Sequence, residues 1–126
     1  MTRGVILFAH GARDPRWAEP FERLAALVGR RVGAGRVALA FLELMTPDLD
    51  AAVAALVASG CTALTIVPVF LGQGTHLRAD LPRLVDAIRA RRPALPIDVV
   101  DAVGEDDAVL AAIADYCVAA GDGRAP

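Results

Sequence analysis

The stretch that decides the fold is VILFA, residues 5–9, which is followed at once by His10. A second apolar run, ALTIVPVFL at residues 63–71, leads after a short loop to His76, the only other histidine of the chain. Continuous apolar runs of this length are typical of strands buried on both faces, as in a parallel sheet covered by helices. Both histidines should therefore emerge at the carboxyl edge of one sheet, where α/β proteins bind their ligands.

The rest of the chain alternates between strand-like and helix-like segments. Strands are expected at residues 4–9, 36–42, 63–69 and 97–100, each followed by an amphipathic or apolar helical segment. Right-handed crossovers leave few orders for four such units, and the flavodoxin-like order 2-1-3-4 is the most common small one. We therefore expect one three-layer α/β/α domain over residues 1–126 with a four-stranded parallel sheet, ending in a frayed tail at 121–126.

Proline positions predict where the helices begin. Asp14 and Pro15 favour a first helix that starts near Pro15, and Thr46 with Pro47 favours a second helix in the same way. Pro82 would break a helix that began at Thr75, so the third helix is expected to start at Asp80. His76 is then predicted to lie in a loop, and the last helix is expected at residues 105–119.

Charge and cysteine content exclude several function classes. The chain has 13 basic and 15 acidic residues with a net charge of −2, which gives no global field for nucleic acid or anionic lipid. Cys61 and Cys117 lie far apart and outside any CxxC motif, so they are expected to be free, buried thiols of a cytoplasmic protein. The apolar run near the N-terminus is too short for a signal-peptide core or a membrane span.

The predicted strand order brings three metal-ligating residue types to one edge. Glu43 directly follows the strand at 36–42, which neighbours the strand before His10, and the strand before His76 lies on the other side. Two imidazoles and a carboxylate suit Co²⁺, Fe²⁺, Ni²⁺ or Zn²⁺, and three protein ligands leave positions open for exchange or catalysis. Each residue also has a simpler interpretation, since a histidine after a strand is often structural and an acid there is often solvated.

The residues around the two histidines offer further candidates. Arg13, Arg16 and Arg78 flank them, and a guanidinium binds carboxylates well, although these arginines could also form a solvated basic fringe. Gly72 and Gly74 could adopt positive φ and let the backbone approach a ligand, or could simply form a turn. A phosphate cradle is poorly supported because the chain has neither GxGxxG nor a P-loop lysine.

Three segments together resemble a known family. They are HGARDP at residues 10–15, the acid Glu43 after a strand, and PVFLGQGTHLRADLP at 68–82. The chain resembles the CbiX and SirB class of sirohydrochlorin chelatases from about residue 4 to about 104. The resemblance implies a class II chelatase that inserts Co²⁺ or Fe²⁺, with Ni²⁺ a third choice, into sirohydrochlorin for cobalamin or sirohaem biosynthesis.

The resemblance also implies residue roles. His10, Glu43 and His76 would hold the metal ion and accept the pyrrole protons. Arg13 and Arg78 would bind substrate carboxylates, with Gly72, Gly74 and Thr75 beside them. The metal is a substrate, so no permanently bound cofactor is expected. Longer members resemble two such units fused, so this single unit is expected to act as a homodimer.

Two other functions stay open from the sequence alone. The chain could be a non-catalytic metal carrier or sensor, which would bind metal stoichiometrically without inserting it. A histidine phosphatase is a weaker alternative, because such an enzyme needs an arginine directly before its first histidine and this chain has Ala9 there.

Overall fold

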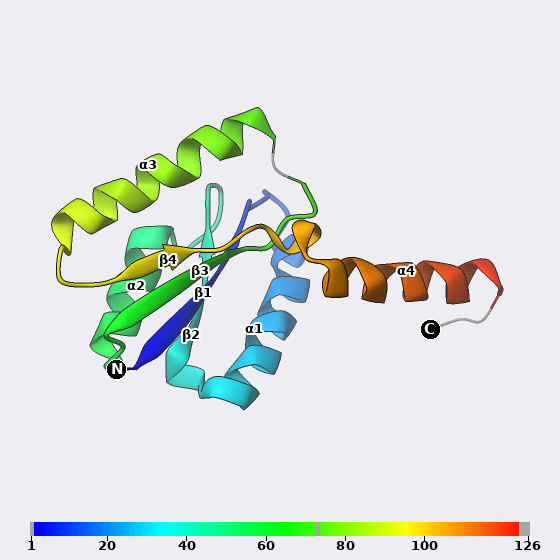
Figure 1. Ribbon diagram of the computed structural model, residues 1–126, viewed down its shortest axis with the longest axis horizontal. Helices are drawn as coiled ribbons and strands as arrows, with labels where there is room; N and C mark the ends of the chain where they lie inside the picture. The colour runs from blue at the N-terminus through cyan, green and yellow to red at the C-terminus, as the bar shows by residue number, and fades with distance from the viewer. Residues whose placement is uncertain (1, 73, 124–126) are drawn as a thin grey trace.

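The computed structural model describes residues 2–72 and 74–123, and the side chains of residues 75–77 lie outside that description. A parallel sheet of four strands, in the order β2-β1-β3-β4, forms its centre (Figure 1). The strands are β1 (Arg3–Ala9), β2 (Val37–Phe41), β3 (Ala63–Pro68) and β4 (Ile97–Val99). The expected fold class and strand order are therefore confirmed, with each strand within two residues of its expected bounds.

Helices follow each strand. In chain order they are η1 (Pro15–Ala18), α1 (Glu19–Val32), η2 (Ala34–Arg36), α2 (Leu49–Ala58), α3 (Thr75–Arg91), η3 (Val103–Glu105) and α4 (Asp107–Gly121), where η marks a short 3-10 helix.

One face of the sheet is covered by α2 and α3. Ile6 and Phe8 of β1 are fully buried on this face, and so are Leu64 and Ile66 of β3. Both helices contribute apolar residues at helical spacing, and those of α3 are Leu81, Val85 and Ile88. This layer holds the main hydrophobic core and orients the strands, so it fixes where each strand ends.

The opposite face is covered only in part. Helix α1 packs over β2 and β1, whereas α4 makes its main contacts with η3 and projects away from the sheet (Figure 1). Several apolar side chains of α4 are consequently exposed: Leu110, Ile113, Tyr116 and Val118. Beside α1 lies a partly uncovered strip, which we define as Thr65 and Val67 of β3, Asp98 of β4, and Val100 directly after β4.

The start of α2 differs from the prediction. The peptide bond before Pro47 is cis, Thr46 and Pro47 lie in the preceding loop, and the helix begins at Leu49. Asp48 is the N-cap residue, because its carboxylate accepts a hydrogen bond of 2.9 Å from the backbone N–H of Ala51. The first helix agrees better, since Asp14 caps η1 and Pro15 is its first residue.

The start of α3 also differs. The helix begins at Thr75, with Gly74 as N-cap, so the predicted loop position of His76 is wrong and the start at Asp80 is five residues too late. Pro82 lies inside the helix and has no N–H to donate to the carbonyl of Arg78. The burial of three apolar residues on one continuous face of α3 outweighs the loss of this hydrogen bond: Leu81, Val85 and Ile88. Because that burial depends on tertiary packing, local propensity alone places the start of the helix too late.

Two smaller expectations need correction. Gly121, expected in a frayed tail, is the last residue of α4, while residues 124–126 lie outside the described part of the chain. Cys61 is buried as expected, but Cys117 is exposed because α4 projects.

In the described part of the chain, no helix is long and apolar enough to cross a membrane.

Candidate metal and substrate site

The side chains of His10 and Glu43 meet at the carboxyl edge of the sheet. Nε2 of His10 lies 3.1 Å from Oε1 of Glu43, which is hydrogen-bonding distance. Both side chains are about half exposed, at 48% and 55%. The pair therefore offers a nitrogen and a carboxylate oxygen to an ion or a ligand that approaches from solvent.

Backbone contacts beyond the strand ends hold this pair together. The N–H of Leu42 donates to the carbonyl of Ala9, and the N–H of Glu43 donates to the carbonyl of His10 at 3.1 Å. The β1–β2 ladder thus continues past both strands and brings the two side chains next to each other. Prediction of this juxtaposition from strand order and from the position of Glu43 after its strand is confirmed.

Gly11 makes this close approach possible. Its φ is +101°, and a Cβ built on it would lie 1.8 Å from the carbonyl oxygen of Glu43. Any larger residue would collide with the backbone of the residue that carries the carboxylate. Glycine after His10 is therefore a geometric requirement of the His10–Glu43 pair.

The chain turns sharply after Glu43. Leu44 has φ +66°, and among the described residues it is the only non-glycine with positive φ. A bulky residue in this region costs about 1–3 kcal/mol. The Leu44 side chain is nevertheless 58% exposed. Sequence reasoning missed this residue, because nothing in the string Glu43-Leu44-Met45 signals a left-handed backbone.

The second histidine is placed only by its backbone. His76 is the second residue of α3, just after the loop that follows β3, and its side chain lies outside the described part of the chain. The side chain of Thr75 also lies outside the described part of the chain. Among the described side chains, no group of three or more His, Cys, Asp or Glu residues could hold a metal ion. The predicted ligand set is thus brought together for His10 and Glu43, and it is untested for His76.

The two glycines before α3 do not adopt the positive φ that the sequence allows for them. Gly74 has φ −71°, Gly72 is not among the positive-φ residues, and a Cβ at either would meet no atom within 4 Å. The open space around Gly72 and Gly74 leaves their backbone accessible from solvent. Their predicted contact with substrate stays a prediction.

Arg13 lies on the β2 side of the site. It lines a hollow of about 500 Å³ together with Glu22 and the apolar side chains of Phe41, Leu44 and Met45, so charged and apolar groups share one hollow. The neighbouring Arg16 is engaged elsewhere, because its guanidinium bonds to the carboxylate of Asp14 at 3.0 Å. That hydrogen bond, with a second from the Arg16 backbone, lowers the pKa of Asp14 below its ordinary value.

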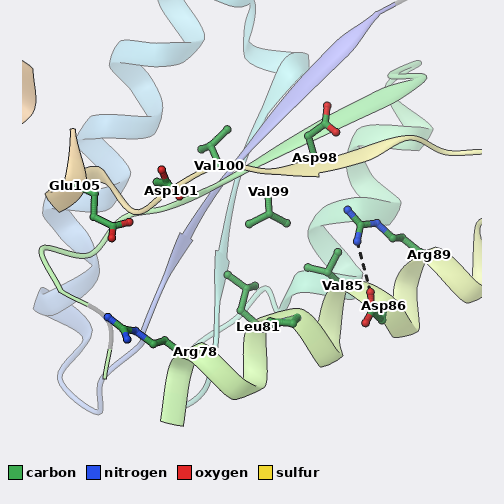
Figure 2. Close-up of a pocket in the computed structure, with 11 residues that line it drawn as sticks. Arg78, Leu81, Val85, Asp86, Arg89, Asp98, Val99, Val100, Asp101 and Glu105 are labelled. Carbon is green, nitrogen blue, oxygen red and sulfur yellow. Dashed lines mark hydrogen bonds and ion pairs between the residues drawn. The ribbon is translucent and has the colours of Figure 1, made fainter. Parts of the chain in front are cut away.

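Arg78 lies on the β4 side. It stands at one end of a pocket of about 610 Å³ between α3 and β4, with Glu105 nearby and the apolar side chains of Leu81, Val85 and Val99 along it (Figure 2). Neither His10 nor Glu43 lines this pocket, although it is the larger of the two hollows. We regard the His10–Glu43 pair as the chemical centre, because it brings a potential metal ligand and a proton acceptor together at the carboxyl edge of the sheet.

Comparisons with known proteins identify the family of this chain. A family model, CbiX, matches residues 4–119. The sirohydrochlorin cobaltochelatase of Saccharolobus solfataricus is 30% identical over 112 residues, which cover 84% of this chain and 86% of that protein. The sirohydrochlorin cobaltochelatase of Methanopyrus kandleri is 33% identical over 81 residues, or 64% of this chain and 57% of that protein.

Solved structures give the same result. A cobalamin biosynthesis CbiX protein from Marinobacter aquaeolei VT8 superposes with a TM-score of 0.86 at 32% identity, covering 97% of each chain. The chelatase SirB from Bacillus subtilis subspecies spizizenii, in complex with cobalt, has a TM-score of 0.80 at 24% identity. That match shows likeness of fold alone, and it covers 94% of this chain but 50% of SirB. On the family model, the relatives and the shared fold, this chain belongs to the CbiX family.

Proposed function

We propose that this protein is a chelatase that inserts a divalent metal ion into sirohydrochlorin, with Co²⁺ as the first choice and Fe²⁺ as the second. The observation that carries the proposal is the His10–Glu43 pair, half exposed at the carboxyl edge of the sheet in a chain of the CbiX family. The relatives named above are sirohydrochlorin cobaltochelatases. Nickel stays a third choice because the same ligands also accept it.

Metal insertion requires the site to perform two functions. Insertion replaces two ring N–H protons by the metal, so the protein must hold the ion beside the ring and accept protons. We assign the metal to His10, Glu43 and His76, and we assign proton acceptance to Glu43 or to a histidine once the ion has left it. The metal ion and the tetrapyrrole are both substrates, and we propose no permanently bound cofactor.

Substrate carboxylates have candidate partners on both sides of the pair. Arg13 lies toward β2 and Arg78 toward β4, and both side chains are exposed. A tetrapyrrole rimmed with carboxylates could therefore be gripped across the carboxyl edge, with His10 from the central strand β1 under the ring. Gly72, Gly74 and Thr75 would line the same edge before α3.

An insertion assay tests the proposed function directly. Purified protein should accelerate Co²⁺ insertion into sirohydrochlorin, followed by absorbance, and should leave protoporphyrin unmetallated. His10→Ala and His76→Ala should each lower turnover by at least about 100-fold. Because His10 is exposed, its substitution should change the free energy of unfolding by less than about 0.5 kcal/mol. Stoichiometric metal binding without insertion would instead identify a carrier or sensor.

We further propose that the working form is a homodimer, and α4 supports this. The first turn of α4, at Val109, lines a hollow with Val67 and Val100 of the strip defined above, whereas the later turns of this apolar helix project away from the sheet (Figure 1). Each chain therefore carries an exposed apolar helix and a strip of sheet that is covered only in part. Two copies related by a twofold axis could bury both exposed surfaces at once, with α4 of each copy covering the strip of the other. A second copy would also shield a ring bound at the exposed edge.

The direction of α4 is set where it leaves the body. The N–H of Gly104 donates to the carbonyl of Phe70 at 2.9 Å, and a Cβ on Gly104 would lie 1.8 Å from the carbonyl oxygen of Leu71. Asp106 then caps the helix by accepting a bond from the N–H of Val109. This anchored start favours a helix held out for a partner over one that folds back on its own sheet.

Light scattering during size exclusion tests the dimer. A species of twice the chain mass of 13.1 kDa is expected at micromolar concentration. A monomer at all concentrations would contradict the homodimer without affecting the insertion assay. For the compartment we propose the cytoplasm, which suits two cysteines that form no disulfide.

A further inference from the structure

Leu44 combines two features that the fold of a single chain does not explain. Its backbone has φ +66°, which glycine or asparagine adopts at lower cost, and its side chain is 58% exposed. Exposure alone is ordinary, since Leu27 on α1 is 53% exposed with a helical backbone. A leucine that has a strained backbone and is more than half exposed gains little from packing within its own chain.

The position of Leu44 points to the site. It directly follows Glu43, whose carbonyl is fixed against Gly11 and whose carboxylate meets His10. It also lines the hollow that holds Arg13, so an apolar side chain and a cation stand at one hollow. Neither His10 nor Glu43 lines this hollow, and its link to the pair is the chain itself, because Leu44 follows Glu43 directly. Strained backbone conformations of this kind cluster at ligand-binding and catalytic sites.

We infer that Leu44 is a substrate-contact residue, which packs against the apolar ring of the tetrapyrrole while Arg13 faces one of the carboxylates at its rim. The inference rests on the proposed chelatase function. A tetrapyrrole has a flat apolar centre and a charged periphery, and this hollow offers the same two kinds of surface side by side. The contact would hold the ring over the His10–Glu43 pair without touching the metal ion.

Substitutions that separate the side chain from the backbone strain test this inference. Leu44→Ala and Leu44→Gly both remove the contact, so each should raise the KM for sirohydrochlorin and the Kd of the metal-free tetrapyrrole by about tenfold, the factor that about 1.4 kcal/mol represents. The KM for Co²⁺ should stay within about twofold of the wild-type value. Leu44→Met, which keeps an apolar side chain of similar volume, should restore most of the affinity.

Thermal unfolding supplies the second measurement. Leu44→Gly should melt at a higher temperature than Leu44→Ala, because glycine adopts positive φ without strain. A purely structural role predicts that difference in melting temperature with unchanged KM. Leu27→Ala is the matched control, since it truncates an equally exposed leucine away from the site and should leave KM, Kd and mass unchanged.

Three results would overturn the inference. Wild-type affinity for sirohydrochlorin in Leu44→Ala and Leu44→Gly would remove Leu44 from the substrate site while leaving the chelatase function intact. A loss of affinity that appears only together with a change from dimer to monomer would make Leu44 a subunit contact instead. Failure of the wild-type protein to insert metal would reject the proposed function, and this inference with it.

Discussion

The two faces of the sheet differ in how far a single chain completes them. On one face, α2 and α3 bury Ile6, Phe8, Leu64 and Ile66 completely. On the other face, α1 covers half of the sheet and α4 stands away from the rest, leaving its own apolar side chains exposed. The contrast teaches that the completed face provides the stability of the chain, whereas the incomplete face is available for association.

The largest expected effect concerns the completed face. Phe8→Ala removes a fully buried ring and should lower the free energy of unfolding by about 3–5 kcal/mol, measured by urea denaturation. Val100→Ala, on the uncovered strip and 44% exposed, is the control and should cost less than about 0.5 kcal/mol in the isolated chain. Similar losses from both would erase the difference between the faces.

The next effect concerns α4. Ile113→Asp places a charge among the exposed apolar side chains of this helix and should weaken self-association by at least about 2 kcal/mol, because the charge would be buried on dimerisation. Light scattering over a dilution series should then show a monomer at concentrations where the wild-type chain is a dimer. Leu27→Asp on α1 is the matched control, and the mass of this variant measured by light scattering should equal that of the wild-type protein.

A smaller effect compares two equivalent helix caps. Asp48 and Asp106 each accept one bond from a backbone N–H, at 2.9 Å and 3.1 Å, at the start of α2 and α4 respectively. Asp48→Ala should cost about 1 kcal/mol of unfolding free energy, because α2 packs on the core. Asp106→Ala should mainly fray α4, which circular dichroism would detect, with little change in the urea midpoint of the monomer. Equal midpoint shifts would mean that α4 folds as part of the core.

The smallest effect is an acid dependence on the α1 side. The hydrogen bonds from Arg16 lower the pKa of Asp14, so the ionised carboxylate stabilises the folded state. That contribution is fully present above the ordinary aspartate pKa of about 3.9 and is lost as the pH falls through the lower folded-state value. Asp14→Asn keeps a side-chain oxygen that can cap the helix but removes the ionisable group. Between pH 6 and pH 3, the urea midpoint of this variant should therefore fall slightly less than that of the wild-type chain. An unchanged slope would show that the Asp14–Arg16 pair adds no stability.

Much of this molecule follows from periodicity. Apolar runs such as residues 5–9 predict buried strands. The rule of right-handed crossovers, together with the most common order of small parallel sheets, predicts the order 2-1-3-4. That order in turn predicts the meeting of His10 with Glu43. Helix starts were harder, because they depend on tertiary burial. Pro82 is tolerated only since Leu81, Val85 and Ile88 pack on the core, and Asp48 replaces Thr46 as the cap next to a cis peptide bond.

Other features leave no trace in a single sequence. The string around Leu44 contains no glycine or asparagine that would signal positive φ, so its backbone becomes visible only in three dimensions. The projection of α4 was equally hidden, because an apolar helix after a strand ordinarily packs on its own sheet. Under the two proposals above, both features would serve contacts outside the isolated chain, with substrate for Leu44 and with a second copy for α4.

The hydrogen bond between His10 and Glu43 has a consequence for how an ion would be taken up. Nε2 of His10 cannot bond to Glu43 and coordinate an ion at the same time, because the nitrogen offers a single site. An ion held at Nε2 would therefore have to replace this hydrogen bond, and the carboxylate of Glu43 would then be free to bind the ion or a proton. An ion held at Nδ1 would leave the hydrogen bond in place, and Glu43 would orient the imidazole from behind.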